Sequence, residues 1–457
     1  MKKLTKELNG LVFKGSEFFE KKKMEKVITI SDLFEGEIVK SDIGQFFQRK
    51  SIIHFSAIDN LPRRGTLHVP PKTLGICNMP LQFREILSHY QALNPETLSI
   101  IGRDSEIGNV NPQSLLFLDT ETTGLAGGTG TYAFLVGCGY FQEDAFIIEQ
   151  FFMEDYHFET AMLLALKDLL SKFEGFVTYN GKCFDIPLLR SRFIYNRIPM
   201  NFEIPNLDLL FIARRLWKRR LGDCSLPSIE SNILNVKREN DIPSELIPYV
   251  YFDYVRGIRR ERMVNVFNHN QQDIFSLAML TILTHNIYEN PYQFDVLEPI
   301  DLYGLALTYQ KDNFYDKAIE CYLQTLDKLG TDSSAVGLSQ KLRDESRTTE
   351  LEFHIRDKLS MLYKKMCDYE NAVNIWFDLV DRFDIDDIFH FEELAKYFEH
   401  KARDYNTAIS IVQKAIQKIE VLCEMSDDIF KKSKYNVSME SLRKRLARLK
   451  KKQNKLG

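Results

Sequence analysis

The 457-residue sequence lacks any CxxC pair among its seven cysteines and any apolar run of the ~20 residues that a membrane-spanning helix needs. An odd number of scattered cysteines argues against a disulfide framework and against a structural zinc site. The first residues, MKKLTKELNGLVFKG, include lysines but no continuous apolar stretch, so no signal peptide is predicted. We therefore expect a cytoplasmic protein without a membrane partner.

The sequence also has little excess charge of either sign. Its 60 basic and 64 acidic residues leave a formal net charge of −4, which excludes a uniformly basic nucleic-acid coat. Any contact with nucleic acid must then come from local patches. Hydrophobic residues make up 44% and charged residues 27%, as in ordinary globular proteins, and the length suggests about three domains at roughly 150 residues each.

Residues 1–112 show no sustained hydrophobic period, and we assign no fold to them. Residues 15–27 could form a helix, whereas 26–34 and 50–58 are strand-like. The isolated His54 and His68 are expected to be structural, because neither accompanies other chemistry-bearing residues.

From residue 113 to 292 the pattern predicts an α/β domain. Three apolar runs at hairpin-like spacing indicate successive strands over 114–121, 131–141 and 145–153. Helical and strand patterns then alternate, with helices expected over 157–173, 184–198 and 259–287 and a further strand over 174–180. A meander followed by alternating elements favours a mixed sheet with helices on both faces.

Beyond about residue 296 the strand signals end. Three segments within 296–430 align on one another, each with an aromatic residue late in a first helix and an alanine early in a second. These positions are Tyr309 and Ala318, Tyr363 and Ala372, and Tyr397 and Ala408. The pattern resembles tetratricopeptide helix pairs, and a generic helical bundle is the alternative. Residues 431–457 are predicted to form a basic helix or tail.

Acidic residues stand where the folding pattern gives them no structural use. Asp119 and Glu121 end an apolar strand two positions apart, so both side chains leave the same face of the sheet. His269 and Asp273 lie four apart on one face of a late helix. Asp185 begins another helix, where an N-cap is its ordinary role, and a capping or surface pair is the ordinary reading of His269 and Asp273. Each signal alone is weak.

In this order, the DxE, NxxxFD and HxxxD motifs resemble the three motifs of DEDD-superfamily exonucleases. LFLDTETTGLAGGTGTYAFLVG, VTYNGKCFDIPLL and HNQQDIFSLA are most similar to the YprB-like exonuclease family, which has a ribonuclease H-like fold. The resemblance implies that Asp119, Glu121, Asp185 and Asp273 bind metal and that His269 is the general base. In proofreading subunits the histidine usually precedes the aspartate by five residues, whereas the spacing of four found here is typical of the tyrosine-containing branch.

The resemblance implies a metal-dependent 3′–5′ exonuclease acting on single-stranded 3′ ends of DNA or RNA. Four carboxylates suit two Mg²⁺ or Mn²⁺ ions, which supply an activated water and stabilise the leaving oxygen. One alternative is an inactive nucleic-acid-binding scaffold whose helical repeats recruit a protein partner, and another is hydrolysis of a small nucleotide.

Four further features are secondary candidates for this site. Asp208 could be a fifth acid, with a cap or an exposed loop acid as its ordinary role. The glycine-rich loop LAGGTGTY could approach a terminal nucleotide or simply make a tight hairpin. Two basic clusters, over 214–220 and 256–262, could contact phosphates or form solvated helix faces.

Overall fold

The computed structural model describes residues 28–54, 89–124, 130–238, 241–291, 297–331, 338–383 and 388–454. The chain divides into two compact units. The first comprises residues 1–214 and 221–294, and the second, which we call the helical unit, comprises 215–220 and 295–457. Within the described ranges, no helix is long and apolar enough to cross a membrane.

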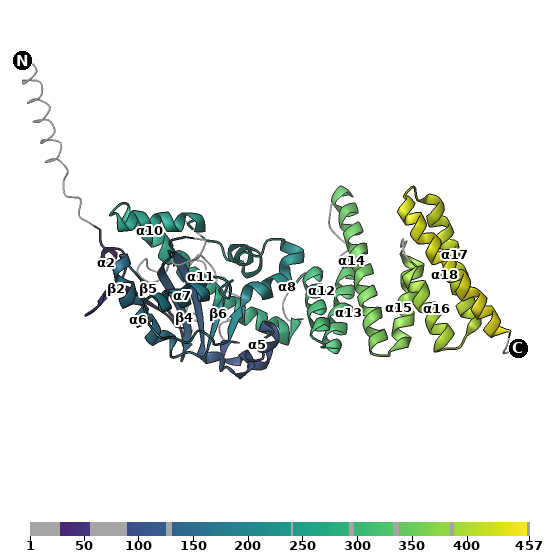
Figure 1. Cartoon of the computed structure of the whole chain (residues 1–457), viewed down its shortest axis with the longest axis horizontal. Helices are drawn as coiled ribbons and strands as arrows, with labels where there is room; N and C mark the ends of the chain where they lie inside the picture. The colour runs from purple at the N-terminus through teal and green to yellow at the C-terminus, as the bar shows by residue number, and fades with distance from the viewer. Residues whose placement is uncertain are drawn as a thin grey trace, which may run out of the picture. The chain divides into compact units, whose positions relative to one another are not determined.

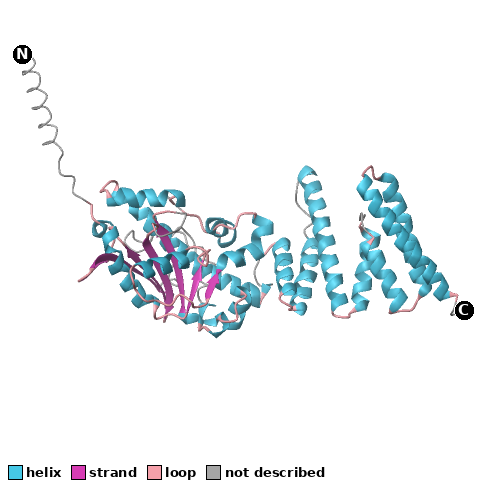
Figure 2. Cartoon of the chain, in the orientation of Figure 1, coloured by secondary structure: helices cyan, strands magenta, loops and turns pink. Residues whose placement is uncertain are grey.

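The first unit is built on one mixed sheet of seven strands in the order β1-β2-β5-β4-β3-β6-β7 (Figure 2). The strands are β1 (Glu37–Ser41), β2 (Gly44–His54), β3 (Leu115–Thr122), β4 (Ala133–Gln142), β5 (Ala145–Phe152), β6 (Gly175–Thr178) and β7 (Asn206–Asp208). As expected from their spacing, β3, β4 and β5 form an antiparallel meander. The strands β6 and β7 then add in parallel to β3, which confirms the predicted mixed α/β sheet.

The N-terminal region contributes to this sheet. Strand β2 pairs antiparallel with β5 and carries β1 on its outer side, so residues 37–54 extend the meander. The predicted strand over 26–34 is wrong, because Ile30–Leu33 form the short helix α2, which begins with a capping box between Thr29 and Asp32. The predicted helix over 15–27 and His68 lie outside the described residues.

Helices of the first unit pack against both faces of the sheet (Figure 1). The α-helices are α2, α5 (Pro95–Gly102), α6 (Glu159–Leu170), α7 (Asp185–Tyr195), α8 (Leu209–Leu221), α9 (Leu226–Ile229), α10 (Ile247–Val255) and α11 (Met263–Glu289). Short 3-10 turns and one π-helical turn, Glu230–Leu234, complete the described helical segments of the first unit.

Helix α11 packs closely on one face of the sheet, against β3 and β4. Two glycines of β4 allow this approach. A Cβ at Gly137 would lie 2.3 Å from Asn270 Oδ1, and one at Gly139 would lie 2.4 Å from the Ile274 side chain. A larger residue at either position would push α11 away from the sheet, because such distances are far below van der Waals contact.

The opposite face of β3 packs with α6 and α7 into the main core, through residues such as Leu116, Leu166 and Leu189. A buried ion pair joins these two helices, since Arg192 Nε and Nη2 each lie 2.6 Å from a carboxylate oxygen of Glu159. Two parallel charge-assisted hydrogen bonds fix the relative orientation of the helices, and with it the start of α7.

The second unit contains only helices among its described residues. They are α12 (Pro299–Lys311), α13 (Tyr315–Thr331), α14 (Leu338–Lys365), α15 (Tyr369–Arg382), α16 (Phe389–His400), α17 (Tyr405–Met425) and α18 (Ile429–Gln453), together with residues 215–220 of α8. The three aligned segments fall on the pairs α12–α13, α14–α15 and α16–α17. In each pair the alanine of the pattern, Ala318, Ala372 or Ala408, is fully buried where the helices meet.

A buried glutamate fastens α18 to the preceding pair. Glu399, on α16, is fully buried and lies within 3.2 Å of side-chain nitrogens of Arg445, Arg448 and Lys452. Burial alone would raise the pKa of Glu399, but the hydrogen bonds from Arg448 and Lys452 lower it to about 2. The carboxylate therefore stabilises the folded helical unit at every pH at which the glutamate of the unfolded chain would be ionised.

We predict that Glu399→Gln lowers the free energy of unfolding of the helical unit by about 2 kcal/mol at neutral pH, allowing for the partly exposed arginine and lysine partners. Because the folded pKa is depressed, this difference should be complete above the unfolded value and shrink as the pH falls toward 2. Urea denaturation at several pH values measures it. Glu440→Gln is the matched control, since Glu440 is exposed and forms its ion pair with Lys444 on its own helix. Equal midpoints for the two variants would contradict the prediction.

Candidate functional site

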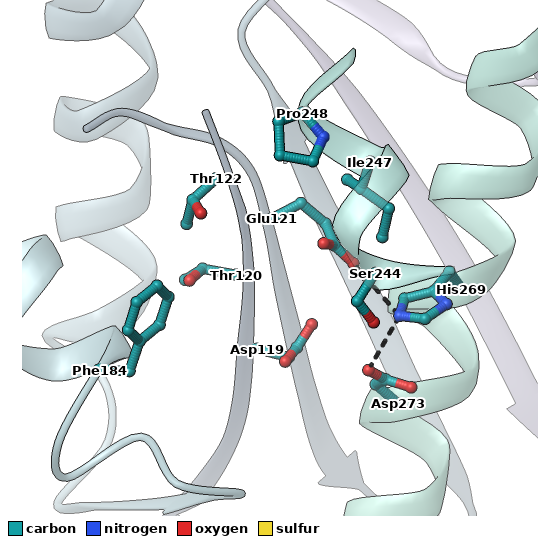
Figure 3. Close-up of a pocket in the computed structure, with 10 residues that line it drawn as sticks. All are labelled: Asp119, Thr120, Glu121, Thr122, Phe184, Ser244, Ile247, Pro248, His269 and Asp273. Atoms are coloured by element: carbon teal, nitrogen blue, oxygen red, sulfur yellow. Dashed lines mark ion pairs between the residues drawn. The ribbon is translucent and has the colours of Figure 1, made fainter. Parts of the chain in front are cut away.

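A pocket on the α11 side of the sheet brings together four of the five predicted site residues. Asp119 and Glu121 enter it from β3, and His269 and Asp273 enter it from α11 (Figure 3). The remaining lining residues are Thr120, Thr122, Phe184, Ser244, Ile247 and Pro248. The prediction from spacing that each pair shares a face is thereby confirmed for both β3 and α11.

The alternation of β3 decides which side chains meet. Asp119 and Glu121 point toward α11, whereas Thr120 and Thr122 point the other way (Figure 3). Asn270 of α11 donates a hydrogen bond from Nδ2 to Asp119 Oδ2 at 2.8 Å, and this bond depends on the close approach at Gly137. The amide thereby holds the Asp119 carboxylate in place at the end of the strand.

Burial and mutual repulsion disfavour ionisation of these acids. Burial, followed by the charges of Asp273, Glu121 and Asp185, raises the pKa of Asp119 well above its usual value. Burial raises the pKa of Glu121 to about 8, with His269 opposing the shift. Glu121 Oε1 is buried and accepts no hydrogen bond from a described residue. Such a cluster is stabilised by a bound cation.

His269 is oriented by a carboxylate that the sequence did not single out. Its Nδ1 lies 2.7 Å from Asp241 Oδ1, which directs Nε2 into the pocket, 3.6 Å from Asp273 Oδ2 and 4.0 Å from Glu121 Oε1. Burial lowers the pKa of His269, but the hydrogen bond with Asp241 and the charges of Asp273 and Glu121 raise it to about 9. An imidazole held in this way has one nitrogen anchored and one free to exchange a proton.

Arg238 is a second residue that the sequence reasoning missed. Its guanidinium contacts Asp273 through Nη2, lies 3.3 Å from Asp241 Oδ2, and lies 2.5 Å from Glu230 Oε2 through Nε. Glu230 is itself buried and accepts a hydrogen bond from Ser276. Arg238 is therefore a largely buried counter-ion that contacts the pocket residue Asp273.

Asp185 does not line the pocket. Helix α7 begins at Asp185 with Phe184 as its N-cap residue, so the expectation that Asp185 caps the helix is wrong. Thr120 Oγ1 instead donates a 2.5 Å hydrogen bond to Asp185 Oδ1 from the other face of β3. Burial raises the pKa of Asp185 to about 6, against the effect of that hydrogen bond. The carboxylate is close enough to raise the pKa of Asp119 and Glu121 as well.

Asp208 fills the capping role that was its ordinary reading. Its Oδ1 accepts hydrogen bonds from the backbone N–H groups of Asn180 and Leu210, and its Oδ2 accepts one from Lys182. The side chain is buried, so it is not an exposed loop acid. Through its hydrogen bonds to Asn180 and Lys182, Asp208 fixes the backbone of the loop that precedes Asp185.

The basic clusters differ in what they contact. In the first, Arg220 is bound within the helical unit, 2.8 Å from Glu298 and 3.0 Å from the buried Asp301. In the second, Arg256 and Arg259 are exposed, whereas Arg260 donates to the Tyr254 carbonyl. Residues 125–129 of the glycine-rich loop lie outside the described residues. The second cluster thus has exposed cations, Arg256 and Arg259, whereas Arg220 of the first cluster is held in ion pairs.

The donor set fits divalent ions of the kind that the family resemblance implies. Asp119, Glu121, Asp273 and the neighbouring Asp185 supply only hard carboxylate oxygens, and the buried Glu121 Oε1 lacks a hydrogen-bond donor among described residues. In the present arrangement no three histidine, cysteine or acidic side chains of the described ranges are close enough to hold one ion together. Two of these carboxylates have other partners: Asp273 forms an ion pair with Arg238, and Asp185 accepts a hydrogen bond from Thr120.

Comparisons with known proteins agree with the fold. A family model described as the RNase_H superfamily matches residues 116–284, which contain every predicted site residue. The uncharacterized protein YprB of Bacillus subtilis (strain 168) is 30% identical over 349 residues, covering 75% of this chain and 76% of that protein. The superfamily match indicates a nuclease domain with a nucleic-acid substrate. The chain belongs to the YprB-like family of the ribonuclease H superfamily.

Proposed function

We propose that this protein is a metal-dependent 3′–5′ exonuclease that hydrolyses phosphodiester bonds of DNA or RNA. The observation that carries the proposal is the pocket in which Asp119 and Glu121 of β3 face His269 and Asp273 of α11. Asp119 and Glu121 have raised pKa values, and Glu121 Oε1 accepts no hydrogen bond from a described residue, as expected of a site built for cations rather than for stability.

Four carboxylates would hold the ions, namely Asp119, Glu121, Asp185 and Asp273. Two Mg²⁺ or Mn²⁺ ions would activate the attacking water and stabilise charge on the leaving oxygen. Asn270 keeps Asp119 in position through its 2.8 Å hydrogen bond. For Asp185 and Asp119 to bind the same ion, the Asp185 side chain would turn away from Thr120, and such a rotation at the first residue of α7 is a small rearrangement.

His269 is proposed to accept the proton of the attacking water at Nε2 when bound cations offset the charges of Asp273 and Glu121, which help to raise the pKa of His269 in the metal-free protein. The hydrogen bond from Nδ1 to Asp241 fixes the ring and favours the charged imidazolium that forms. This arrangement uses the four-residue spacing between His269 and Asp273 directly, because one helical turn brings both side chains to the same pocket.

The test is incubation of purified full-length protein with end-labelled DNA and RNA oligomers, with Mg²⁺, with Mn²⁺ and with a chelator. Metal-dependent release of mononucleotides from the 3′ end is the expected result. Binding without hydrolysis in both metals would favour the alternative of an inactive nucleic-acid-binding scaffold. Label at either end distinguishes the direction of degradation, and the DNA and RNA arms identify the preferred sugar.

Arg238→Gln should separate the two roles of the Arg238 guanidinium. The variant leaves the buried Glu230 without its counter-ion, so the metal-free protein should lose about 3–5 kcal/mol of stability. It also removes the cation that competes for Asp273, so Mn²⁺ should raise the melting temperature by more than in wild type. Thermal unfolding with and without Mn²⁺ measures both effects.

Arg190→Gln is the matched control for that experiment. Arg190 forms an ion pair with Glu203, but both side chains are exposed at the surface. Its substitution should leave the melting temperature and the metal-induced shift unchanged. An equal Mn²⁺ shift in wild type and Arg238→Gln would mean that Arg238 does not compete with the ions.

A further inference from the structure

The helical unit carries a concentration of positive charge at one end of α18. Residues 441–454 include seven basic residues and no acidic one. The fold adds two more cations, Lys401 and Arg403, from the turn between α16 and α17. We use the name basic cap for the six residues Lys401, Arg403, Arg448, Lys450, Lys451 and Lys452.

Contacts between α18 and the α16–α17 turn bring these two segments together (Figure 1). Lys452 Nζ lies 2.8 Å from Glu399 Oε1 and 6.0 Å from the centre of the Tyr405 ring. Gln453, the next residue, donates a hydrogen bond to Asn406. The last turn of α18 therefore adjoins the first turn of α17, and residues distant in sequence form one basic surface.

Internal neutralisation accounts for only part of this charge. Glu399 is buried beneath the cap and is shared by Arg445, Arg448 and Lys452. Asp404 is occupied as the N-cap of α17, accepting hydrogen bonds from the Thr407 N–H and hydroxyl. Among the described residues of this surface, two carboxylates thus accompany seven cations, counting Arg445, and neighbouring like charges repel one another unless anions join them.

Packing between helix pairs explains some of these cations but not all. Lys401 lies 4.9 Å from the Tyr369 ring centre, Lys452 covers Tyr405, and Lys365 covers Tyr315 at 4.6 Å in the preceding pair. These repeated contacts have a structural use. In contrast, Arg403, Lys450 and Lys451 are exposed, and none of the three forms an ion pair with a described residue.

We propose that the basic cap binds the phosphate backbone of nucleic acid, at a site additional to the pocket of the first unit. Unpaired cations beside half-exposed tyrosines are typical of surfaces that hold nucleic-acid strands. The excess of cations complements a polyphosphate, whose bound counterions are released on contact. The cap would hold the substrate strand on the helical unit independently of hydrolysis.

The test measures binding of fluorescent oligomers to the full-length protein in chelator, by anisotropy across a series of salt concentrations. In the triple variant Arg403→Gln, Lys450→Gln, Lys451→Gln, the slope of log affinity against log salt should become shallower by about 2–3. Affinity at about 0.1 M salt should fall roughly 100-fold, because each lost phosphate contact contributes about 0.7–0.9 to the slope. Single-stranded and duplex oligomers identify which form of the backbone the cap prefers.

The matched control is Lys431→Gln, Lys432→Gln, Lys434→Gln, which removes the same charge at the opposite end of α18. It should bind nearly as tightly as wild type. An unchanged slope in the first variant, or equal losses in both, would overturn the proposal. An acidic protein as the true partner would also leave oligomer affinity unchanged in the first variant.

Acylation footprinting of the wild-type protein tests the same point without any substitution. An oligomer should protect Lys450 and Lys451 from an amine-reactive reagent and leave Lys434 reactive, whereas equal reactivity with and without the oligomer would overturn the proposal. Neither measurement requires hydrolysis. If the protein proves to have no nuclease activity, the proposed function fails while binding at the cap still stands or falls by these results.

Discussion

Asp119→Asn should abolish hydrolysis while leaving the fold intact. The substitution removes a proposed metal ligand at the centre of the pocket, so activity should fall below about a tenth of wild type at every metal concentration. Metal-free stability should rise at neutral pH. Burial and the neighbouring acids raise the pKa of Asp119 in the folded state, so its ionisation opposes folding above the unfolded pKa, and asparagine cannot ionise.

Two measurements check this result together, namely single-turnover hydrolysis of a labelled oligomer and thermal unfolding in chelator. The stability gain should disappear below about pH 4, where the aspartate of the unfolded wild-type chain is also protonated. Asp144→Asn is the matched control, because Asp144 is an exposed acid in the turn of the same sheet. Retention of more than about a tenth of the activity in a metal titration would show that the site is misassigned.

His269→Ala is expected to lower kcat by roughly 10²–10⁴, the usual contribution of a positioned general base. The affinity for Mn²⁺ should change little, because the proposed role of His269 is to accept a proton and not to hold an ion. Exogenous imidazole should restore part of the activity of the alanine variant. His269→Tyr should also retain part of it, since a spacing of four belongs to the tyrosine-containing branch. Asp241→Asn should give an intermediate loss, because it releases the ring without removing it.

The control for this prediction is His157→Ala. His157 also places Nδ1 2.7 Å from an aspartate, Asp155, but the pair is exposed and lies outside the pocket. Its substitution should not alter kcat. If His269→Ala keeps near-wild-type kcat, then His269 only packs and pairs with Asp241, and the carboxylates alone constitute the site.

Local periodicity was sufficient to predict the elements that carry the site. A period of two places Asp119 and Glu121 on one face of β3, and one helical turn places His269 beside Asp273 on α11. The recurring alanines likewise predicted the helix pairs, because only a small side chain fits where two helices pack closely. These relations depend on backbone geometry, which neighbouring residues determine.

Contacts between distant segments could not be predicted in this way. Arg238 and Asp241 lie in a segment without hydrophobic period, and only the packing of that segment beside α11 brings them to His269 and Asp273. The pairing of β2 with β5 is similar, since a strand of mixed exposure carries no local mark of its partner.

The sequence by itself determined which acids share a face and which helices pair, because both follow from the repeat of a single element. The tertiary structure decided which face meets which. Gly137 and Gly139 let α11 approach the acidic face of β3, and Asp185 pairs with Thr120 on the other face because α7 packs there. The tertiary structure also brought Lys401 and Arg403 close to the end of α18, because the last turn of α18 packs against the start of α17.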